Sequence, residues 1–421
     1  MYMDTELEAC PMRSLFTRGF TLLLLGQISS LIGNYTLKFA LSMYVLEVTG
    51  SASVFAGLLA AGIVPTILLS PFGGVLADRL DRRRLMVALD ALSGLAVLLA
   101  GLLLPLGGIP VIGGLLIVLS VLGAFESPTV QACVPQLLPP EQLLRGNALV
   151  SQTAALAGLI TPFLGSLVYT AFGLHPVLRV TAVCFFLTAL LECFLRLPSH
   201  RREDPPCSIP AMLRADLGES LRFLCREEPS ILKLLLLAAL ASLFVAGVAV
   251  VGFPYLVRTV LGLSAEHYGA AESVMGAAAI LGSLTAGVLG QRFRARWLAG
   301  LLMGFGLCLL PAGLSFLLPL GPFPRYLVMV AAFAACQLGC SLFSTCAITL
   351  IQARTPERLM GKVMSCVFTL SLCAQPLGQL IYGGLFDHFS IAPHWVLLPT
   401  GLLVCALAAA SAPLFGSLER P

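Results

Sequence analysis

The sequence predicts an all-α membrane protein in which twelve transmembrane helices form two pseudo-symmetric six-helix bundles. Three observations predict this fold class: an apolar composition, apolar blocks of membrane-spanning length, and an internal repeat. Hydrophobic residues make up 58% of the 421 residues, charged residues make up 11%, and the mean hydropathy is +0.95. Because a soluble domain carries about 25% charged residues, this composition excludes a water-soluble protein.

The apolar residues fall into blocks of roughly 20 residues or more, the length that crosses about 30 Å of hydrocarbon as a helix. Asp4, Glu6 and Glu8 precede the first block, which lacks a small-residue cleavage site, so we expect a helix there and not a cleaved signal. Internal prolines such as Pro128 are tolerated in membrane helices. We expect spans at residues 17–46, 52–76, 84–104, 111–133, 146–170, 177–197, 230–256, 267–290, 297–318, 325–350, 361–384 and 395–415.

The distribution of Lys and Arg predicts the orientation of these spans. With the N-terminus placed in the cytoplasm, 21 of the 25 basic residues fall on the cytoplasmic side and three on the outside, while Lys38 stays within a span. Such an excess follows the positive-inside rule. Both termini are therefore expected to be cytoplasmic.

A polar stretch at about residues 198–229 divides the chain into an N-terminal bundle, residues 1–197, and a C-terminal bundle, residues 230–421. Apolar residues recur at helical spacing from Met212 to Leu224, opposite charged ones, which predicts an amphipathic helix at the cytoplasmic interface. We interpret this stretch as a linker; a regulatory docking site is the alternative.

Three alignments indicate that the bundles are duplicates. Residues 74–83 align with 287–296, residues 140–144 with 356–360, and residues 164–169 with 377–382, at offsets of 213, 216 and 213. Because each half has six spans, both copies have the same orientation in the membrane. This predicts a parallel repeat about an axis along the membrane normal, as in carriers that rock about a central site.

Other functional classes find little support. The thirteen cysteines and five histidines form no CxxC or HExxH pattern, so we expect no metal, no cofactor and no membrane-embedded enzyme. There is no G-x-x-x-x-G-K-[ST] loop, which disfavours an ATP-driven pump. Nucleic acid is not an expected partner.

The loop after the second span is similar to the hallmark G-x-L-A-D-R-x-G-R-[RK] of the major facilitator superfamily. The matching residues are Gly74, Leu76, Ala77, Asp78, Arg79, Arg82 and Arg83. Asp81 replaces the second glycine, a variant typical of the branch with bacterial macrolide-efflux and enterobactin-export proteins, which the chain most resembles over nearly its whole length. The resemblance implies a carrier in the bacterial inner (plasma) membrane that acts as a monomer.

In that family this loop latches the two halves on the cytoplasmic side. By resemblance, Asp78 is expected to face the start of the eleventh span, near Gly361 and Lys362, where a helix N-terminus stabilises a carboxylate. The arginines would hold nearby acidic groups, with Asp90 and Glu126 within reach. The alternative is that the arginines only set topology and bind anionic lipid headgroups.

A second family motif, G-x8-G-x3-G-P-x2-G-G in the fifth span of many proton-coupled exporters, is only partly matched. Pro162 and Gly165 survive, and small residues such as Ala148, Ala157 and Ser166 fill most other positions. Close helix packing is therefore expected. This partial match weakens, but does not remove, the implication that the protein is a proton antiporter.

Ionisable groups within spans are costly and suggest function. Glu126 lies nearest to a span centre, and Asp90 lies one to two turns inside the third span. A carboxyl group removed from water can bind and release a proton near neutral pH, so both are proton-coupling candidates. The alternative for Glu126 is an ion pair with an arginine of the cytoplasmic loop.

Four polar residues within spans are candidates for a substrate cavity: Asn34, Lys38, Gln152 and Gln375. Lys38 could bind an anionic group or extend to the outer interface. The glutamines could equally make hydrogen bonds between helices.

These observations predict a secondary active transporter, with proton-coupled efflux of small amphiphilic molecules of the drug, macrolide or siderophore type as the first hypothesis. Transport follows from topology, duplication and the loop motif, whereas export and substrate class follow from the resemblance alone. A solute uptake symporter and a lysolipid flippase on the same scaffold are the alternatives. The expected partners are a small-molecule substrate, protons and the lipid bilayer.

Overall fold

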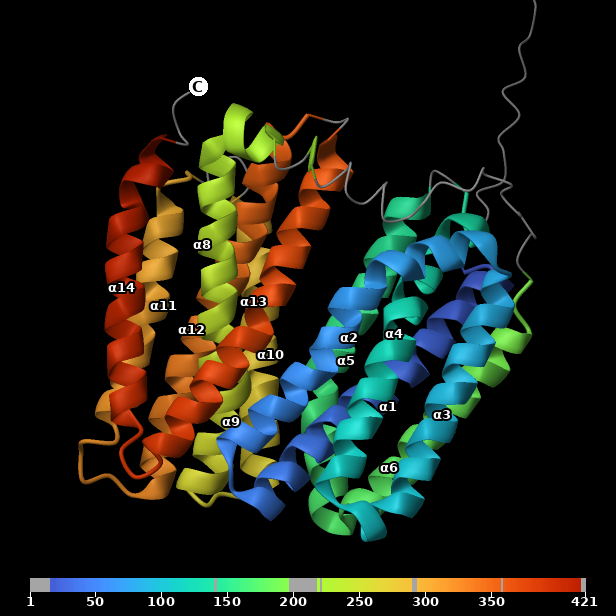
Figure 1. Cartoon of the computed structure of the whole chain (residues 1–421), viewed down its shortest axis with the longest axis horizontal. Coiled ribbons are helices and arrows are strands. Elements are labelled where there is room, and N and C mark those ends of the chain that lie inside the picture. The colour runs from blue at the N-terminus through green and yellow to red at the C-terminus, as the bar shows by residue number, and fades with distance from the viewer. Residues whose placement is uncertain are drawn as a thin grey trace, which may run out of the picture.

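Helices account for all the regular structure in the part of the chain that the computed structural model describes, residues 16–139, 142–196, 218–219, 222–289, 294–356 and 359–417. Within these ranges, twelve helical segments are long and apolar enough to cross a membrane. The predicted fold class is therefore confirmed (Figure 1).

The first six spans form the N-terminal bundle. Their bounds are α1 Arg18–Thr49, α2 Ala52–Arg79, α3 Arg82–Gly107, α4 Ile109–Leu137, α5 Leu143–Phe172 and α6 Leu174–Cys193. The predicted spans lie within or close to these helices, which extend by several residues beyond the hydrocarbon-length core.

The C-terminal bundle begins with a composite span, Pro229–Val260, in which π-helical turns interrupt the α-helix. A short π-helical segment, η2, precedes it. The elements are η2 Phe223–Glu227, α8 Pro229–Val245, η3 Ala246–Gly252, α9 Phe253–Tyr255, η4 Leu256–Val260, α10 Ala265–Leu289, α11 Trp297–Leu314, α12 Pro322–Arg354, α13 Met360–His388 and α14 His394–Ser417.

Short turns join several of the N-terminal helices. Gly50, at φ 60°, separates α1 from α2, and Gly173, at φ 75°, separates α5 from α6, so both turns need the left-handed backbone that glycine tolerates. Asp81 is the N-cap of α3 and accepts a hydrogen bond from the Arg84 amide at 3.0 Å. The acid that replaces the family's glycine thus stabilises the start of the third span.

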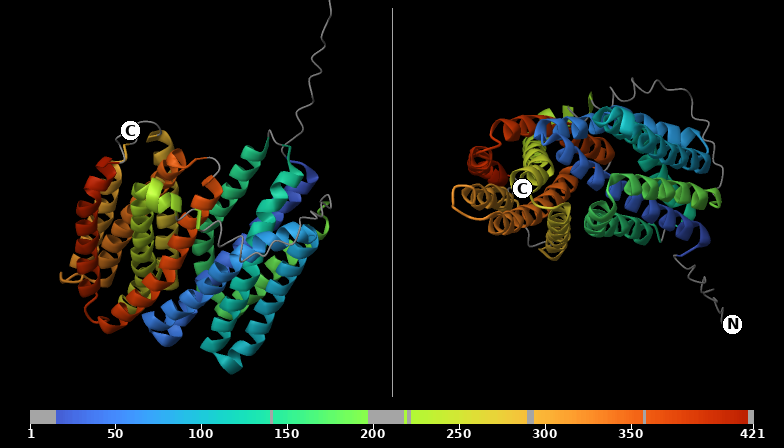
Figure 2. Two further views of the ribbon diagram at one scale, coloured as in Figure 1. Left: turned by 45° about the horizontal axis from the view of Figure 1, so that its top comes forward. Right: turned by 90° about the horizontal axis from the view of Figure 1, so that it is seen from below.

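The two bundles lie side by side and meet on one side of the membrane only. Because α1 begins and α14 ends on the same side, we call that side the terminal face and the opposite side the far face. The bundles diverge toward the terminal face and converge at the far face, where α2 crosses α13 (Figures 1 and 2). Two seams join them, α2 against α13 and α5 against α10.

The predicted domain limits at residues 197 and 230 stay predictions. Residues 197–217, 220 and 221 lie outside the described residues, and with them most of the expected amphipathic helix.

Glycines allow α13 to pack closely on the composite span. A Cβ on Gly378 would lie 2.0 Å from the Leu243 carbonyl oxygen, and one on Gly247 would lie 2.2 Å from the Tyr382 ring. Small residues permit this approach of helix backbones in membranes. The inner wall of the C-terminal bundle depends on this contact.

Gly378→Ala is expected to destabilise the protein by about 1–3 kcal/mol, because an added methyl group overpacks a backbone contact. Gly384→Ala is the matched control on the same helix, since no atom lies within 4 Å of its added Cβ. The measurement is thermal unfolding in detergent. Equal melting temperatures for Gly378→Ala and the wild type would contradict the described packing.

Candidate functional site

The C-terminal bundle contains a cavity of about 490 Å³ between α8, η3, α11, α12 and α13. Apolar side chains such as Phe305 and Phe368 make up much of its wall. None of its lining residues is Asp, Glu, Lys, Arg or His. The polar lining residues are Ser242, Gln337, Cys340, Ser341, Ser344, Thr345, Ser371 and Gln375.

The volume falls in the range of small-molecule sites, roughly 300–1,000 Å³. Hydroxyl and amide groups on an apolar wall can hydrogen-bond an uncharged, oxygen-rich molecule while burying its apolar surface. Of the four predicted cavity residues, Gln375 lies in this lining. Asn34, Lys38 and Gln152 belong to the N-terminal bundle and do not line this cavity.

The N-terminal bundle holds three acids within its spans, whereas Glu272 of α10, beside Tyr268, is a buried acid of the C-terminal bundle. Glu126 on α4 is half-buried, and its Oε1 lies 3.5 Å from the Ser30 hydroxyl of α1. Lys38, further along α1, is its positively charged neighbour. Sequence reasoning did not single out Ser30, because a lone serine within an apolar span carries no signal of its own.

Asp90 on α3 and Glu192 on α6 are 0% and 1% exposed. Neither Asp90 oxygen has a hydrogen-bond partner among the described residues, and the Glu192 carboxyl group lies close enough for the two charges to interact. Glu192 thus lies beside the predicted pair of Asp90 and Glu126, and the charges of all three interact.

The described contacts of the loop arginines do not include Asp90 or Glu126, and the expectation that these arginines hold the two acids stays a prediction. Arg82 donates to the Ala132 carbonyl of α4 at 2.9 Å, while Arg83 is exposed. Asp90 is fully buried, and the hydrogen bond of Glu126 comes from Ser30. The ion pair that was the alternative for Glu126 is therefore absent from its described contacts.

The hallmark loop after the second span, the predicted gating motif, is only partly described by the structure. Gly74, Asp78 and Arg79 belong to the last two turns of α2, but their side chains lie outside the described residues. At the predicted partner site, the Lys362 ammonium group pairs with Glu219 of the linker at 2.6 Å.

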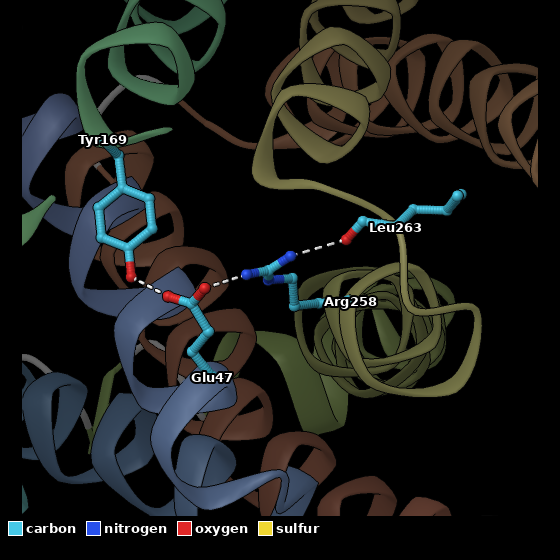
Figure 3. A network of polar contacts seen from close by, with 4 residues as sticks. All are labelled: Glu47, Tyr169, Arg258 and Leu263. Carbon is cyan, nitrogen blue, oxygen red and sulfur yellow. Dashed lines mark hydrogen bonds and ion pairs between the residues drawn. The ribbon is translucent and has the colours of Figure 1, made fainter. Parts of the chain in front are cut away.

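A polar network joins the two bundles at the far face (Figure 3). Glu47 of α1 accepts hydrogen bonds from the Tyr169 hydroxyl of α5 and from the Arg258 guanidinium of η4. Arg258 also donates to the Leu263 carbonyl at 2.9 Å. Glu47 and Tyr169 come from the N-terminal bundle, and Arg258 and Leu263 come from the C-terminal bundle.

An aromatic contact lies about two turns deeper along α1. The Phe39 ring stacks on Tyr268 of α10 with a centroid distance of 5.3 Å, and Phe253 and Phe333 continue this cluster into the C-terminal bundle. The far-face closure therefore has a polar layer and an aromatic layer.

The fifth span packs closely where the second motif was partly matched. A Cβ on Gly269 of α10 would lie 2.7 Å from the Pro162 carbonyl oxygen, and one on Gly165 would lie 3.5 Å from Thr36 of α1. The Ser273 hydroxyl donates to the Leu159 carbonyl across the seam at 2.8 Å. Pro162 and Gly165 thus lie where α5 contacts both α1 and the other bundle.

Within the described residues, no group of three or more His, Cys, Asp or Glu side chains is arranged to hold a metal ion.

Comparisons with known proteins agree with this architecture. Macrolide efflux protein A of Streptococcus pyogenes is 25% identical over 386 residues, which cover 90% of this chain and 92% of that protein. Enterobactin exporter EntS of Salmonella typhi is 25% identical over 328 residues, 74% of this chain and 72% of that protein.

Among solved structures, a bacterial homologue of the iron transporter ferroportin is 21% identical to the chain. Its inward-facing state matches with a TM-score of 0.70, covering 97% of this chain and 100% of that one. Its outward-facing state matches with a TM-score of 0.60, covering 95% and 100%. The sequence model of the Major Facilitator Superfamily matches residues 23–365 and 235–417. The chain therefore belongs to the major facilitator superfamily of membrane transporters, and its resemblance to the branch of macrolide-efflux and enterobactin-export proteins is confirmed.

Proposed function

We propose that this transporter exports small amphiphilic molecules by alternating access in exchange for protons. The proposal rests on one observation, that the two bundles contain different kinds of polar side chains. The C-terminal bundle holds a neutral cavity suited to an uncharged amphiphile, and the N-terminal bundle holds the carboxyl cluster of Glu126, Asp90 and Glu192.

The orientation follows from the basic residues. With 21 of 25 on the side of the termini, the terminal face is cytoplasmic and the far face is outside. The bundles then meet at the outer face and diverge toward the cytoplasm. The better superposition on the inward-facing state of the ferroportin homologue supports this interpretation.

Glu126 is the proton-coupling residue in this scheme. Its carboxyl group has a hydroxyl donor on one side and the positive charge of Lys38 nearby, so protonation changes the balance of charge in the N-terminal bundle. A proton that enters from the outside neutralises Glu126, and its release to the cytoplasm restores the charge. The buried carboxyl groups of Asp90 and Glu192 lie within electrostatic range of Glu126, and the scheme assigns them a second exchangeable proton.

The substrate class follows from the cavity and from the relatives. Macrolide efflux protein A and enterobactin exporter EntS have names that refer to oxygen-rich amphiphiles or their export, which supports an oxygen-rich substrate here. The cavity lining contains no basic residue to bind a phosphate group, which favours this class over a lysolipid. An uptake symporter would use the same site with the opposite direction of flux.

The remaining assignments complete the scheme. Asp78 is the cytoplasmic latch in the outward-facing state, close packing at Pro162 and Gly165 holds α5 against its neighbours, and the carrier works as a monomer.

The first test is a proton-flux assay in proteoliposomes with a panel of macrolides, siderophores, sugars and lysolipids. A macrolide or siderophore is expected to evoke a pH change, and Glu126→Gln is expected to reduce that flux by roughly tenfold or more, because it removes the exchangeable proton. Glu227→Gln, at an exposed site of η2, is the control and should behave as wild type. Full proton-dependent transport by Glu126→Gln would exclude the coupling role.

The second test concerns the cavity. Gln375→Leu is expected to weaken binding of the substrate identified in the flux assay by about fivefold, because one hydrogen bond is worth about 1 kcal/mol. Gln152→Leu is the matched substitution at a residue that does not line the cavity and should leave the Kd unchanged. Equilibrium binding in detergent measures both. If Gln152→Leu weakened binding and Gln375→Leu did not, the substrate site would lie in the N-terminal bundle instead.

The third test concerns the polar network of Figure 3. Glu47→Gln removes the charge that holds Arg258, so the outer face is expected to open more often. In a variant that keeps Cys340 as its single cysteine, a membrane-impermeant thiol reagent added outside should then label the cavity several-fold faster than in the Glu47 parent. Unchanged labelling would show that the network does not control outer access.

A further inference from the structure

Asp387, the penultimate residue of α13, binds the start of α2 in the other bundle. Its Oδ1 accepts a hydrogen bond from the Ala52 amide at 2.6 Å. Its Oδ2 accepts from the Ser53 amide at 3.0 Å and from the Ser51 hydroxyl at 2.6 Å. A carboxylate of the C-terminal bundle therefore caps a helix of the N-terminal bundle.

This cap is shared between the bundles because α2 cannot complete it alone. The first amides of a helix have no carbonyl partner within the helix. Ser51 supplies the ordinary N-cap contact, since its hydroxyl accepts from the Val54 amide at 3.2 Å. The amides of Ala52 and Ser53 are bound by Asp387, whose charge is also stabilised at a helix N-terminus.

The packing around this cap requires close contact of the two helices. One turn before Asp387, a Cβ on Gly383 would lie 2.6 Å from the Ala56 Cβ and 3.0 Å from the Ala52 carbonyl oxygen. The glycine lets α13 lie directly on the first turn of α2. The carboxylate is thus positioned by backbone packing as well as by its own hydrogen bonds.

The pseudo-symmetric seam between α5 and α10 lacks this device. At the repeat offset of 213, Leu174 stands where Asp387 does, and it has no group that could accept a hydrogen bond through its side chain. At the start of α10, Ser264 instead contacts His267 of its own helix at 2.8 Å. The cap by Asp387 is therefore a feature of one seam and not a consequence of the duplicated fold.

We propose that Asp387 locks the two bundles together at the far face. Its hydrogen bonds to the start of α2 form when the bundles meet there and break when the bundles separate. The inference rests on the alternating access of the proposed function. The lock holds the carrier with its cavity open to the terminal face, so that substrate loads from that side. It differs from the pair of Glu47 and Arg258, two side chains that are 43% and 20% exposed, because its partners are mainly backbone amides at fixed positions.

The test measures the far-face opening directly. Spin labels are attached at Leu106→Cys and Leu318→Cys, exposed far-face positions in the two bundles, after replacement of the thirteen native cysteines. Pulsed dipolar distances in lipid nanodiscs then report the ratio of open to closed states without substrate. Asp387→Asn replaces one acceptor oxygen by an amide donor and removes the charge, so this ratio is expected to rise roughly tenfold or more.

Glu266→Gln is the matched control, because Glu266 is an exposed acid in the first turn of α10 on the same face. The lock is overturned if Asp387→Asn leaves the distances unchanged or if Glu266→Gln shifts them equally. Asp387→Glu, which keeps the charge and both acceptors, should recover part of the closed population, and a monodisperse elution profile establishes that each variant is folded. Since the assay contains no substrate and no proton gradient, failure of proton-coupled export in the flux assay would leave this result standing.

Discussion

The contact between the bundles at the far face is the interaction on which the rest of the structure depends. In hydrocarbon each span satisfies its own backbone as a helix, so the helices of a bundle are held by packing, whereas the bundles must be able to separate. The contacts that join them therefore combine features that can break and re-form: an ion-pair network at Glu47, a stacked aromatic pair at Phe39, and a carboxylate cap at Asp387. All three lie toward one face, which leaves the bundles free to diverge at the other.

The separation of chemistry between the bundles follows from the same constraint. A charge that faces hydrocarbon is costly, and the carboxyl groups of Glu126, Asp90 and Glu192 are accordingly collected inside one bundle, where their charges interact and the Ser30 hydroxyl contacts Glu126. The other bundle keeps only neutral polar groups around its cavity. In the proposed mechanism, coupling between proton and substrate needs no direct contact, because both proposed sites would bias the same rocking motion between two states of the protein.

The sequence predicted the fold well because hydrocarbon imposes a strong length and composition requirement on each span. It predicted Glu126, Asp90 and Gln375 as sites from a simple rule, the cost of a polar group at membrane depth, and the structure brings Gln375 into a cavity and Asp90 beside a third acid. It failed where partners are distant in sequence. Glu47 and Arg258 are 211 residues apart and lie at span ends, where charges are common, so no spacing marks them as a pair.

The position of Asp387 gives the predicted cytoplasmic latch a physical counterpart. The helices α2 and α13 cross the membrane in opposite directions, and each carries an aspartate near its C-terminal end, Asp78 and Asp387. Asp387 caps the start of α2 at the far face, and the family resemblance predicts that Asp78 faces the start of α13 at the terminal face. Rocking that closes one face opens the other, so the two caps would form in alternate states. Under this proposal, matching caps at both ends of the helix pair would keep those states close in free energy, and a small change in charge at Glu126 would then shift the balance between them.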